Sequence, residues 1–209
     1  MMINLIPRFY DVTHGTIKID NVDVRKYDQK TLRNKIGYVP QKNKLISGTI
    51  ALNVAYSSQD GVIDEEKVRE AITIAKADSF INEFEKGLNR IITKNGSNIS
   101  GGQRQRICIA RAIYKNPKII LLDDAFSALD YKTDLEVRTE LKKKFVDAII
   151  IIVSQRINTI CDADKIIVLD KGKISGIGSH KELKENNVVY QQILSSQFSE
   201  KEKNNDWRS

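Results

Sequence analysis

The most informative part of the sequence reads Asn98-Ile99-Ser100-Gly101-Gly102-Gln103-Arg104-Gln105-Arg106. Its two glycines allow backbone N–H groups to approach a ligand closely, and a helix is expected from the same point to Tyr114. Because the start of a helix carries partial positive charge, the stretch favours an anion site suited to phosphate. A bare Ser-Gly-Gly turn would usually mark only a helix start, but the whole stretch is far more specific.

A second motif is Ile119-Ile120-Leu121-Leu122-Asp123-Asp124, an apolar run that ends in two carboxylates. Such a run is typical of a strand in a parallel sheet, and ligands of these sheets bind at the carboxyl ends of the strands. One carboxylate could hold Mg²⁺, usually through water, and the next could orient an attacking water. Taken alone, the run could equally be an ordinary strand followed by an aspartate that caps a helix.

Around these motifs, segments of strand length alternate with segments of helical period. Strands are expected at Gly15–Asp20 and Ile36–Val39, and buried strands at Ala148–Val153 and Lys165–Leu169. Helices are expected from Asp28 to Lys35, over Tyr131–Lys144, and after the capping box Ser179-His180-Lys181-Glu182. A helical insertion is expected at Gly48–Lys86, with Val68, Ile72 and Ala75 on one face. The alternation predicts an α/β fold, a mostly parallel sheet with helices on both faces.

The charge and composition limit the class of protein. Thirty-four basic and 27 acidic residues give a net charge of +7, which can indicate nucleic acid, a membrane surface or polyphosphate as a partner. Because acidic residues are interleaved with basic ones, a solvated surface is the simpler interpretation, and no nucleic-acid partner is expected. The longest apolar run, Ala148–Val153, is much shorter than the roughly 20 residues of a spanning helix, so a soluble chain is expected. Cys108 and Cys161 lack metal-ligand spacing, which makes a reducing compartment the default.

The motifs occur in one order along the chain, namely Arg8-Phe9-Tyr10-Asp11, Gly15-Thr16-Ile17, Tyr38-Val39-Pro40-Gln41, Ser47-Gly48-Thr49-Ile50, Ser100-Gly101-Gly102-Gln103, Leu122-Asp123-Asp124, Ser127-Ala128-Leu129-Asp130, Ile150–Arg156, Lys165–Gly172 and Gly178-Ser179-His180-Lys181-Glu182-Leu183. This series resembles the nucleotide-binding domain of an ATP-binding cassette (ABC) transporter of the exporter type. The resemblance covers about residues 2–198 and implies a P-loop NTPase-like sheet, an antiparallel β segment and a helical subdomain at about 47–115. The domain is thus expected over residues 1–198, followed by a polar tail at 199–209.

The resemblance also implies the roles of particular residues toward ATP and Mg²⁺. Gln41 corresponds to the glutamine that touches Mg²⁺ and couples the domain to transmembrane helices, and Asp123 to the aspartate that holds Mg²⁺. The signature residues cap the γ-phosphate of the ATP bound by a partner domain, and here they are Ser100, Gly101, Gly102 and Gln103. Asp130 corresponds to an aspartate that communicates across a dimer of two such domains, which closes head to tail around two nucleotides.

The largest departure from the family is the absence of a Gly-x-x-x-x-Gly-Lys-Ser/Thr motif from the sequence. In the family this P-loop lies just upstream of the segment that Met2–Tyr10 resembles, together with a central strand and an aromatic residue that stacks on adenine. The chain is therefore interpreted as a fragment that lacks the P-loop and the N-terminal strands. We expect it to bind ATP poorly alone and to expose two strand edges.

Two further departures lie at the predicted catalytic positions. Asp124 stands where active family members usually have the glutamate that polarises water, and Gln155 stands where they usually have a histidine. The aspartate side chain is shorter by one C–C bond, about 1.5 Å. Together the changes resemble the degenerate site of a heterodimeric exporter, although neutral drift in an inactive fragment would leave the same residues.

The function implied by the resemblance is that of an ATPase domain that energises export. It would work with a second nucleotide-binding domain and with a transmembrane domain fused upstream, at the cytoplasmic face of the cell membrane. The alternative is a non-catalytic partner, or a gene fragment, that contributes only its signature motif to another subunit. A protein acting on nucleic acid or ribosomes is the least favoured class, and steeply salt-dependent binding would identify it.

Overall fold

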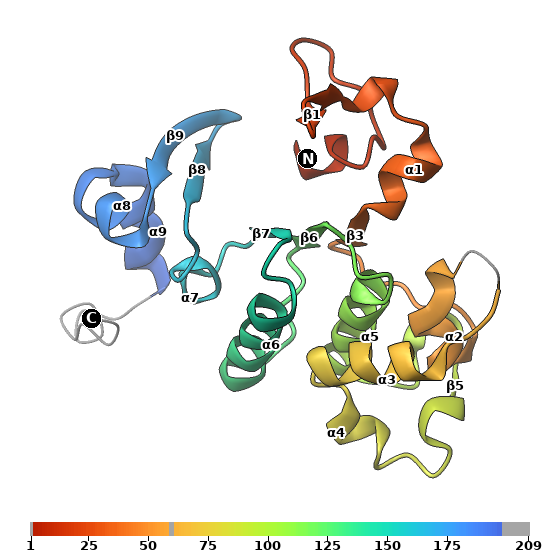
Figure 1. Cartoon of the computed structure of the whole chain (residues 1–209). Coiled ribbons are helices and arrows are strands. Elements are labelled where there is room, and N and C mark those ends of the chain that lie inside the picture. The colour runs from red at the N-terminus through yellow and green to blue at the C-terminus, as the bar shows by residue number, and fades with distance from the viewer. Residues whose placement is uncertain (1, 59–60, 198–209) are drawn as a thin grey trace. The chain divides into compact units, whose positions relative to one another are not determined.

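The computed structural model describes residues 2–58 and 61–197. The chain forms two compact units, Met1–Val153 and Ser154–Ser209, and each is described by itself (Figure 1). The expected polar tail at 199–209 lies outside the described residues. Within the described ranges, the structure has no helix long and apolar enough to span a membrane.

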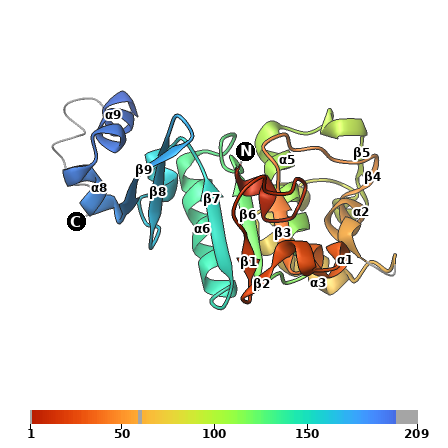
Figure 2. The ribbon, with the colours of Figure 1, turned by 90° about the horizontal axis from the view of Figure 1, so that it is seen from above.

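A parallel three-stranded sheet forms the centre of the first unit. Its strands are β3 (Ile36–Val39), β6 (Ile119–Asp123) and β7 (Ile149–Val153), with β6 in the middle (Figure 2). Val39 pairs with Leu122, and Asp123 pairs with Val153. The predicted parallel sheet is therefore confirmed, and the carboxyl ends of all three strands meet at one edge.

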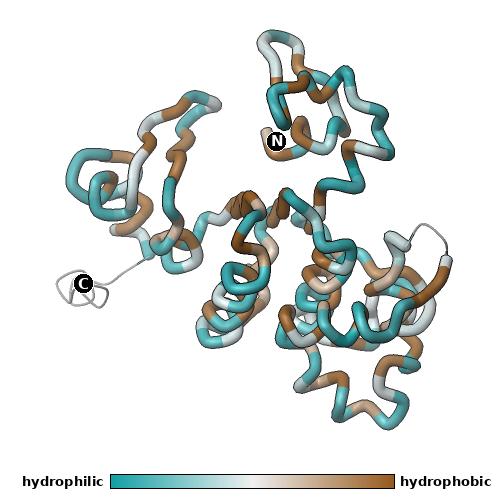
Figure 3. The backbone as a smooth tube through the Cα atoms, viewed as in Figure 1, coloured by the Kyte–Doolittle hydropathy of each residue, from teal (hydrophilic) through white to brown (hydrophobic). Residues whose placement is uncertain are grey.

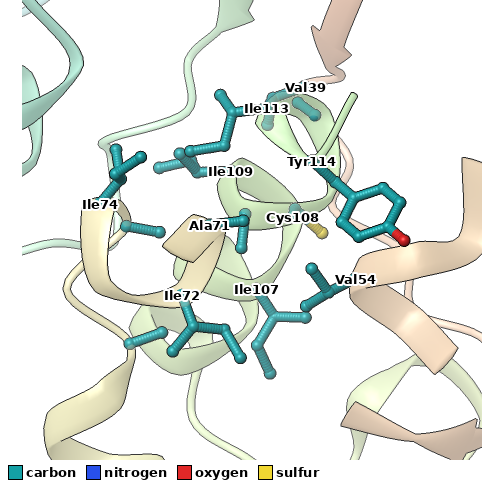
Figure 4. Close-up of a cluster of buried hydrophobic side chains, with 14 of the residues drawn as sticks. Val39, Val54, Ala71, Ile72, Ile74, Ile107, Cys108, Ile109, Ile113 and Tyr114 are labelled. Carbon is teal, nitrogen blue, oxygen red and sulfur yellow. The ribbon is translucent and has the colours of Figure 1, made fainter. Parts of the chain in front are cut away.

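One face of this sheet is covered by α5 (Gly101–Ile113) and α6 (Tyr131–Lys144), which carry the largest buried cluster. The predicted bounds of α6 are confirmed to the residue. The helical insertion follows as α2 (Ile50–Val54), η3 (Ala55–Ser57), α3 (Glu65–Ile74) and α4 (Asp78–Ile81). Figure 4 shows Ala71 and Ile72 of α3 packed with Ile107 and Ile109 of α5. Val68, Ile72 and Ala75 are buried together, as their spacing predicts.

The insertion begins as a strand rather than a helix. Gly48–Thr49 forms β4, which pairs antiparallel with β5 (Ile91–Ile92), and short 3₁₀ helices η4 (Gly87–Asn89) and η5 (Lys94–Gly96) flank β5. The buried Asn53 closes the start of this segment, because its side chain exchanges hydrogen bonds of 3.0 Å with both backbone groups of Ile46. The predicted antiparallel β segment is present here and in two hairpins.

The other face of the sheet is covered by the N-terminal segment. Ile3 of η1 (Met2–Leu5) is buried in a small cluster with Ile119 and Leu121. The chain then forms β1 (Lys18–Ile19), β2 (Val22–Asp23), η2 (Val24–Lys26) and α1 (Gln29–Asn34). The side chain of Asp28 accepts a hydrogen bond from the Thr31 N–H and caps α1, as predicted.

The expected strand Gly15–Asp20 is too long. The structure keeps only Lys18–Ile19 as a strand, because Asp20 and Asn21 both have positive φ and form a two-residue turn into β2. Such turns favour Asp and Asn at these positions and end the strand before them. The segment is therefore a hairpin rather than one continuous strand.

The prediction that Ala148–Val153 is a buried strand is wrong in its burial. The strand β7 forms, but its residues are half-buried or exposed, and Ile149 is 62% exposed. Among the described residues β7 pairs only with β6, so it lies at an edge of the sheet. Figure 3 shows that β7 is nonetheless apolar along its length.

The second unit is a hairpin packed with helices. Its elements are α7 (Ile157–Ile160), β8 (Ile166–Asp170), β9 (Lys173–Gly178), α8 (His180–Asn186) and α9 (Val188–Gln197). The strand predicted at Lys165–Leu169 forms as β8, but the prediction of its burial is wrong. The strand pairs antiparallel with β9 and alternates between buried Val168 and half-exposed Ile167 and Leu169. The predicted capping box is confirmed, because Ser179 and Glu182 cap each other at the start of α8.

Candidate active site

The segments that carry the predicted magnesium ligands lie at the carboxyl edge of the three-stranded sheet. Val39 of β3 and Leu122 of β6 are paired, and Gln41 and Asp124 each follow their paired residue by two positions. Parallel pairing therefore brings the segment of Gln41 beside the two carboxylates, as the sequence predicts. Gln41 is exposed, Asp124 is half-buried and Asp123 is 5% exposed.

The Asp123 carboxylate lies where a negative charge is unfavourable. Burial raises its pKa, and the neighbouring charge of Asp124 raises it further. Burial also raises the pKa of Tyr38, whose hydroxyl donates to Asn4 Oδ1 at 2.8 Å. A bound cation would relieve the repulsion between the two adjacent carboxylates.

The donor set fits Mg²⁺ bound with few protein ligands. Within the described residues there is no group of three or more His, Cys, Asp or Glu side chains that could hold a metal ion. Mg²⁺ commonly takes one or two carboxylates and completes its shell with water and substrate phosphates. One carboxylate from Asp123 and an amide oxygen from Gln41 match that pattern.

Hydrogen bonds of its own backbone groups hold Asp124 in place. Its φ is 53°, its N–H donates to the carbonyl of Val153 at 2.9 Å, and its carbonyl accepts from Ser127 Oγ at 3.0 Å. The left-handed conformation disfavours most residues but suits a short polar side chain. These contacts fix the direction in which the Asp124 side chain leaves the edge of the sheet.

The signature residues form the start of α5. Ser100 is the N-cap, its Oγ accepts from the Gln103 N–H at 3.2 Å, and the Gln103 side chain accepts from the Ser100 N–H at 3.0 Å. Gly101 and Gly102 lie in the first turn against the loop that follows β6. A Cβ on Gly102 would lie 3.0 Å from the carbonyl oxygen of Ala128, so this glycine also serves close packing.

Asp130 caps α6 rather than standing free. Its two carboxylate oxygens accept from the Thr133 N–H at 3.0 Å and from the Thr133 hydroxyl at 2.7 Å. These hydrogen bonds lower the pKa of Asp130. Its position between the signature turn and α6 is compatible with a role at a domain interface, and that role remains a prediction.

Gln155 belongs to the second unit, two residues along the chain from the end of β7. The turn around it is held by Gln197, the last residue of α9. The Gln197 side chain donates to the Gln155 carbonyl and accepts from the Ile157 N–H at 3.0 Å. Sequence reasoning did not single out Gln197, because the contact joins residues far apart in the chain.

Two arginines of the signature helix bind backbone carbonyls. Arg104 donates to the Asn95 carbonyl at 2.9 Å, and Arg106 donates to the Lys76 carbonyl at 2.7 Å. The Arg106 guanidinium also lies 4.7 Å from the centre of the Phe80 ring. Arg106 is thus partly buried against the helical insertion.

Gln105 is the functional candidate that sequence reasoning missed. It is 4% exposed and points from α5 into the loop after β6. The available signal was a polar residue on the face of α5 that also carries the buried Cys108 and Ile109. A glutamine in such a place must find hydrogen-bond partners inside the protein.

Comparison with known proteins places this arrangement in a class. A bacterial Atm1-family ABC exporter with ATP bound has the same fold, with a TM-score of 0.90 and 34% identity over 95% of this chain and 35% of that one. The fold is therefore the α/β fold of the P-loop NTPase-like class, as predicted. Residues 1–127 match the family described as ABC transporter, and the chain belongs to that family.

Curated relatives narrow the type of transporter. An uncharacterised ABC transporter ATP-binding protein of Mycobacterium tuberculosis is 44% identical over 197 residues, which are 94% of this chain and 34% of that protein. The ATP-dependent lipid A-core flippase of Coxiella burnetii is 40% identical over 200 residues, 96% of this chain and 34% of that protein. The chain has the nucleotide-binding domain of the exporter type, and it spans about a third of the length of these relatives.

Proposed function

We propose that the chain acts as the ATP-binding domain of an exporter and closes head to tail with a second nucleotide-binding domain. The observation that supports this proposal is the parallel pairing of β3 with β6, which brings the segment of Gln41 to the same sheet edge as Asp123 and Asp124. In the proposed dimer, the turn Ser100–Gln103 faces the nucleotide of the partner domain. The N–H groups at the start of α5 and its partial positive charge suit a phosphate there.

Each predicted site residue has a separate task in this proposal. Asp123 and Gln41 hold Mg²⁺, which neutralises charge on the nucleotide phosphates when it is bound. Asp124 orients the attacking water by accepting one of its protons in a hydrogen bond. Gln155 donates a hydrogen bond to the γ-phosphate but cannot become cationic as a histidine can.

Asp124 and Gln155 support the proposal that ATP hydrolysis at this site is slow. A carboxylate that is about 1.5 Å too short leaves the water poorly placed, and a misplacement of about 1 Å can lower a rate on the order of a hundredfold. We therefore propose a degenerate site in a heterodimer, whose competent site receives the intact signature of this chain. The alternative is a partner without catalysis of its own.

ATP binding by this chain alone is proposed to be weak. The sequence has no Gly-x-x-x-x-Gly-Lys-Ser/Thr motif, which elsewhere cradles the phosphates. Charge-assisted hydrogen bonds contribute roughly 1.5–3 kcal/mol each, so the lack of three would cost on the order of 5 kcal/mol. That is several thousandfold in affinity.

The transported substrate and the location of the protein are proposed by analogy with its relatives. Their names describe a lipid A-core flippase and a putative multidrug export protein of Bacillus subtilis. We propose an amphipathic molecule as the transported substrate. In this proposal transmembrane helices, in the same protein or in a partner subunit, hold the domain at the cytoplasmic face of the membrane.

The first test is ATP hydrolysis by the native protein in its longest form, with and without its partner subunit. Asp124→Glu should raise kcat on the order of tenfold or more, because the longer carboxylate reaches the water. Asp123→Asn should abolish Mg²⁺-dependent nucleotide binding. Asp147→Glu, at an exposed position near the opposite end of β7, is the matched control and should change neither quantity.

The result also separates the two candidate functions. Hydrolysis by the wild type that does not exceed that of Gln41→Ala would exclude an ATPase and leave the non-catalytic partner. In that case Gly101→Asp, which places a negative side chain at the signature turn, should still lower hydrolysis by the partner's site.

A further inference from the structure

The signature turn and the loop after β6 are joined by the side chain of Gln105. Its Nε2 donates to the Asp124 carbonyl at 3.3 Å and to Ser127 Oγ at 3.0 Å, and its Oε1 accepts from the Ala128 N–H at 2.9 Å. The side chain is almost fully buried. Both amide protons and the amide oxygen of Gln105 are therefore used inside residues 124–128.

The backbone that Gln105 holds is left-handed at Asp124. The φ of Asp124 is 53°, a conformation that most residues adopt rarely and that aspartate adopts more readily. Such a conformation persists only where the surroundings hold it in place. The Asp124 N–H is held by Val153, while its carbonyl is held by Ser127 and Gln105.

The same loop also packs directly on the signature glycines. A Cβ on Gly102 would lie 3.0 Å from the Ala128 carbonyl oxygen, and one on Gly101 would lie 3.5 Å from the Ala128 Cβ. A shift of the first turn of α5 toward this loop would therefore press on Ala128, whose N–H is bound by Gln105. Interiors this closely packed transmit small displacements.

We propose that Gln105 is a positioning residue that links the signature turn to the main chain of Asp124. Through this link, a phosphate bound at Ser100–Gln103 on one side sets the orientation of the Asp124 carboxylate on the other. Because the two motifs face different nucleotides in the proposed dimer, Gln105 couples the two ATP sites within one domain. The catalytic consequence rests on the proposed function, whereas the link itself is a property of this chain.

Gln105→Glu tests the link through its pH dependence. A protonated glutamic acid can donate to the Asp124 carbonyl and accept from the Ala128 N–H, as the amide does. A carboxylate cannot donate and repels the Asp124 carbonyl and carboxylate. Since burial raises the pKa of a carboxyl group, the variant should change between these two states from about pH 5 to pH 8.

The measurement is deuterium exchange of the amides of 124–129, as protection factors corrected for intrinsic rate, in the full chain without nucleotide. In Gln105→Glu, protection should fall at least tenfold from about pH 5 to pH 8, while the amides of Tyr38 and Val39 serve as an internal reference. The wild type and Gln191→Glu should show no such fall. Gln191 is the matched control, since its Nε2 also donates to two backbone carbonyls, those of Lys184 and Glu185.

Gln105→Met removes every hydrogen bond of the side chain and nearly keeps the side-chain volume. The loop should lose protection at every pH, and in the ATPase assay kcat should fall at least fivefold with KM for ATP changed less than twofold. If Gln105→Met does not fold, Gln105→Glu at about pH 5 provides the folded reference. Protection in Gln105→Glu that is independent of pH would overturn the link.

Failure of this inference is distinguishable from failure of the proposed function, because the exchange experiment needs no ATP. Suppose that loop protection in Gln105→Glu depends on pH, but kcat for ATP in Gln105→Met equals that of the wild type. This result would overturn the catalytic part of the proposal. A pH-dependent loop in a protein that never hydrolyses ATP would overturn the proposed function and leave the link standing.

Discussion

At the scale of single residues, Asp123 shows how a functional group lowers the stability of its own fold. Burial and the charge of Asp124 raise its pKa, so the ionised form is disfavoured in the folded chain. The cost is absent at low pH, appears as pH rises past the ordinary value of about 4, and is complete above the raised pKa.

Asp123→Asn should therefore stabilise the chain at neutral pH when no metal or nucleotide is present. We expect Tm to rise by a few degrees, since about 1 kcal/mol corresponds to roughly 2–4 °C in a chain of this size. Thermal unfolding in EDTA at about pH 7.5 measures the effect, and the gain should vanish near pH 3. A lower Tm for Asp123→Asn at neutral pH would contradict this explanation.

At the scale of secondary-structure elements, β3 approaches the end of α5 closely at Gly37. A Cβ on Gly37 would lie 2.2 Å from the Ala112 carbonyl oxygen and 2.9 Å from Pro117 Cγ. Gly37→Ala should destabilise the chain by about 3 kcal/mol or more, because a backbone carbonyl cannot move aside cheaply. Urea unfolding gives the value.

Gly15→Ala is the matched control for Gly37→Ala. A Cβ on Gly15 meets nothing within 4 Å, and its φ is 78°. It should cost only the strain of a positive φ, about 1 kcal/mol. Equal losses in the two variants would mean that β3 and α5 are not packed as described.

The elements differ in how well the sequence predicts them. Helix starts at Asp28, Ser100, Asp130 and Ser179 are predicted correctly, because an N-cap acts within three residues of itself. The burial of β7 and of β8 is predicted wrongly, because the elements that cover or leave open the face of a strand can be distant in the chain. Gln105 and Gln197 escape prediction for the same reason, since their partners lie on other elements.

At the scale of the whole molecule, acid should unfold the chain in a definite range. Among the residues that the structure describes, seven carboxyl groups have a pKa lowered by an ion pair or by hydrogen bonds, many of them from helix-capping N–H groups. The pKa of Asp23 falls to about 2 because of Arg25. The others are Asp11, Asp28, Asp64, Asp130, Glu140 and Glu182.

Groups with a lowered pKa contribute stability above their unfolded values of about 4, and that stability is lost as pH falls toward their folded values. The urea midpoint should therefore fall steadily between about pH 4 and pH 2, despite the opposite contribution of Asp123. A midpoint that stays flat over this range would contradict the hydrogen bonds and ion pairs described for these carboxyl groups.

The contact between Gln197 and the turn at Gln155 depends on the rotation of the end of α9 about the helix axis. Ten residues, Val188–Gln197, separate the start of α9 from the side chain that holds this turn. Removing one residue anywhere within them would rotate the end of the helix by about 100° and swing Gln197 away. Changes at the exposed positions of α9 would therefore leave this contact in place, whereas an insertion or deletion within α9 would release the turn at Gln155.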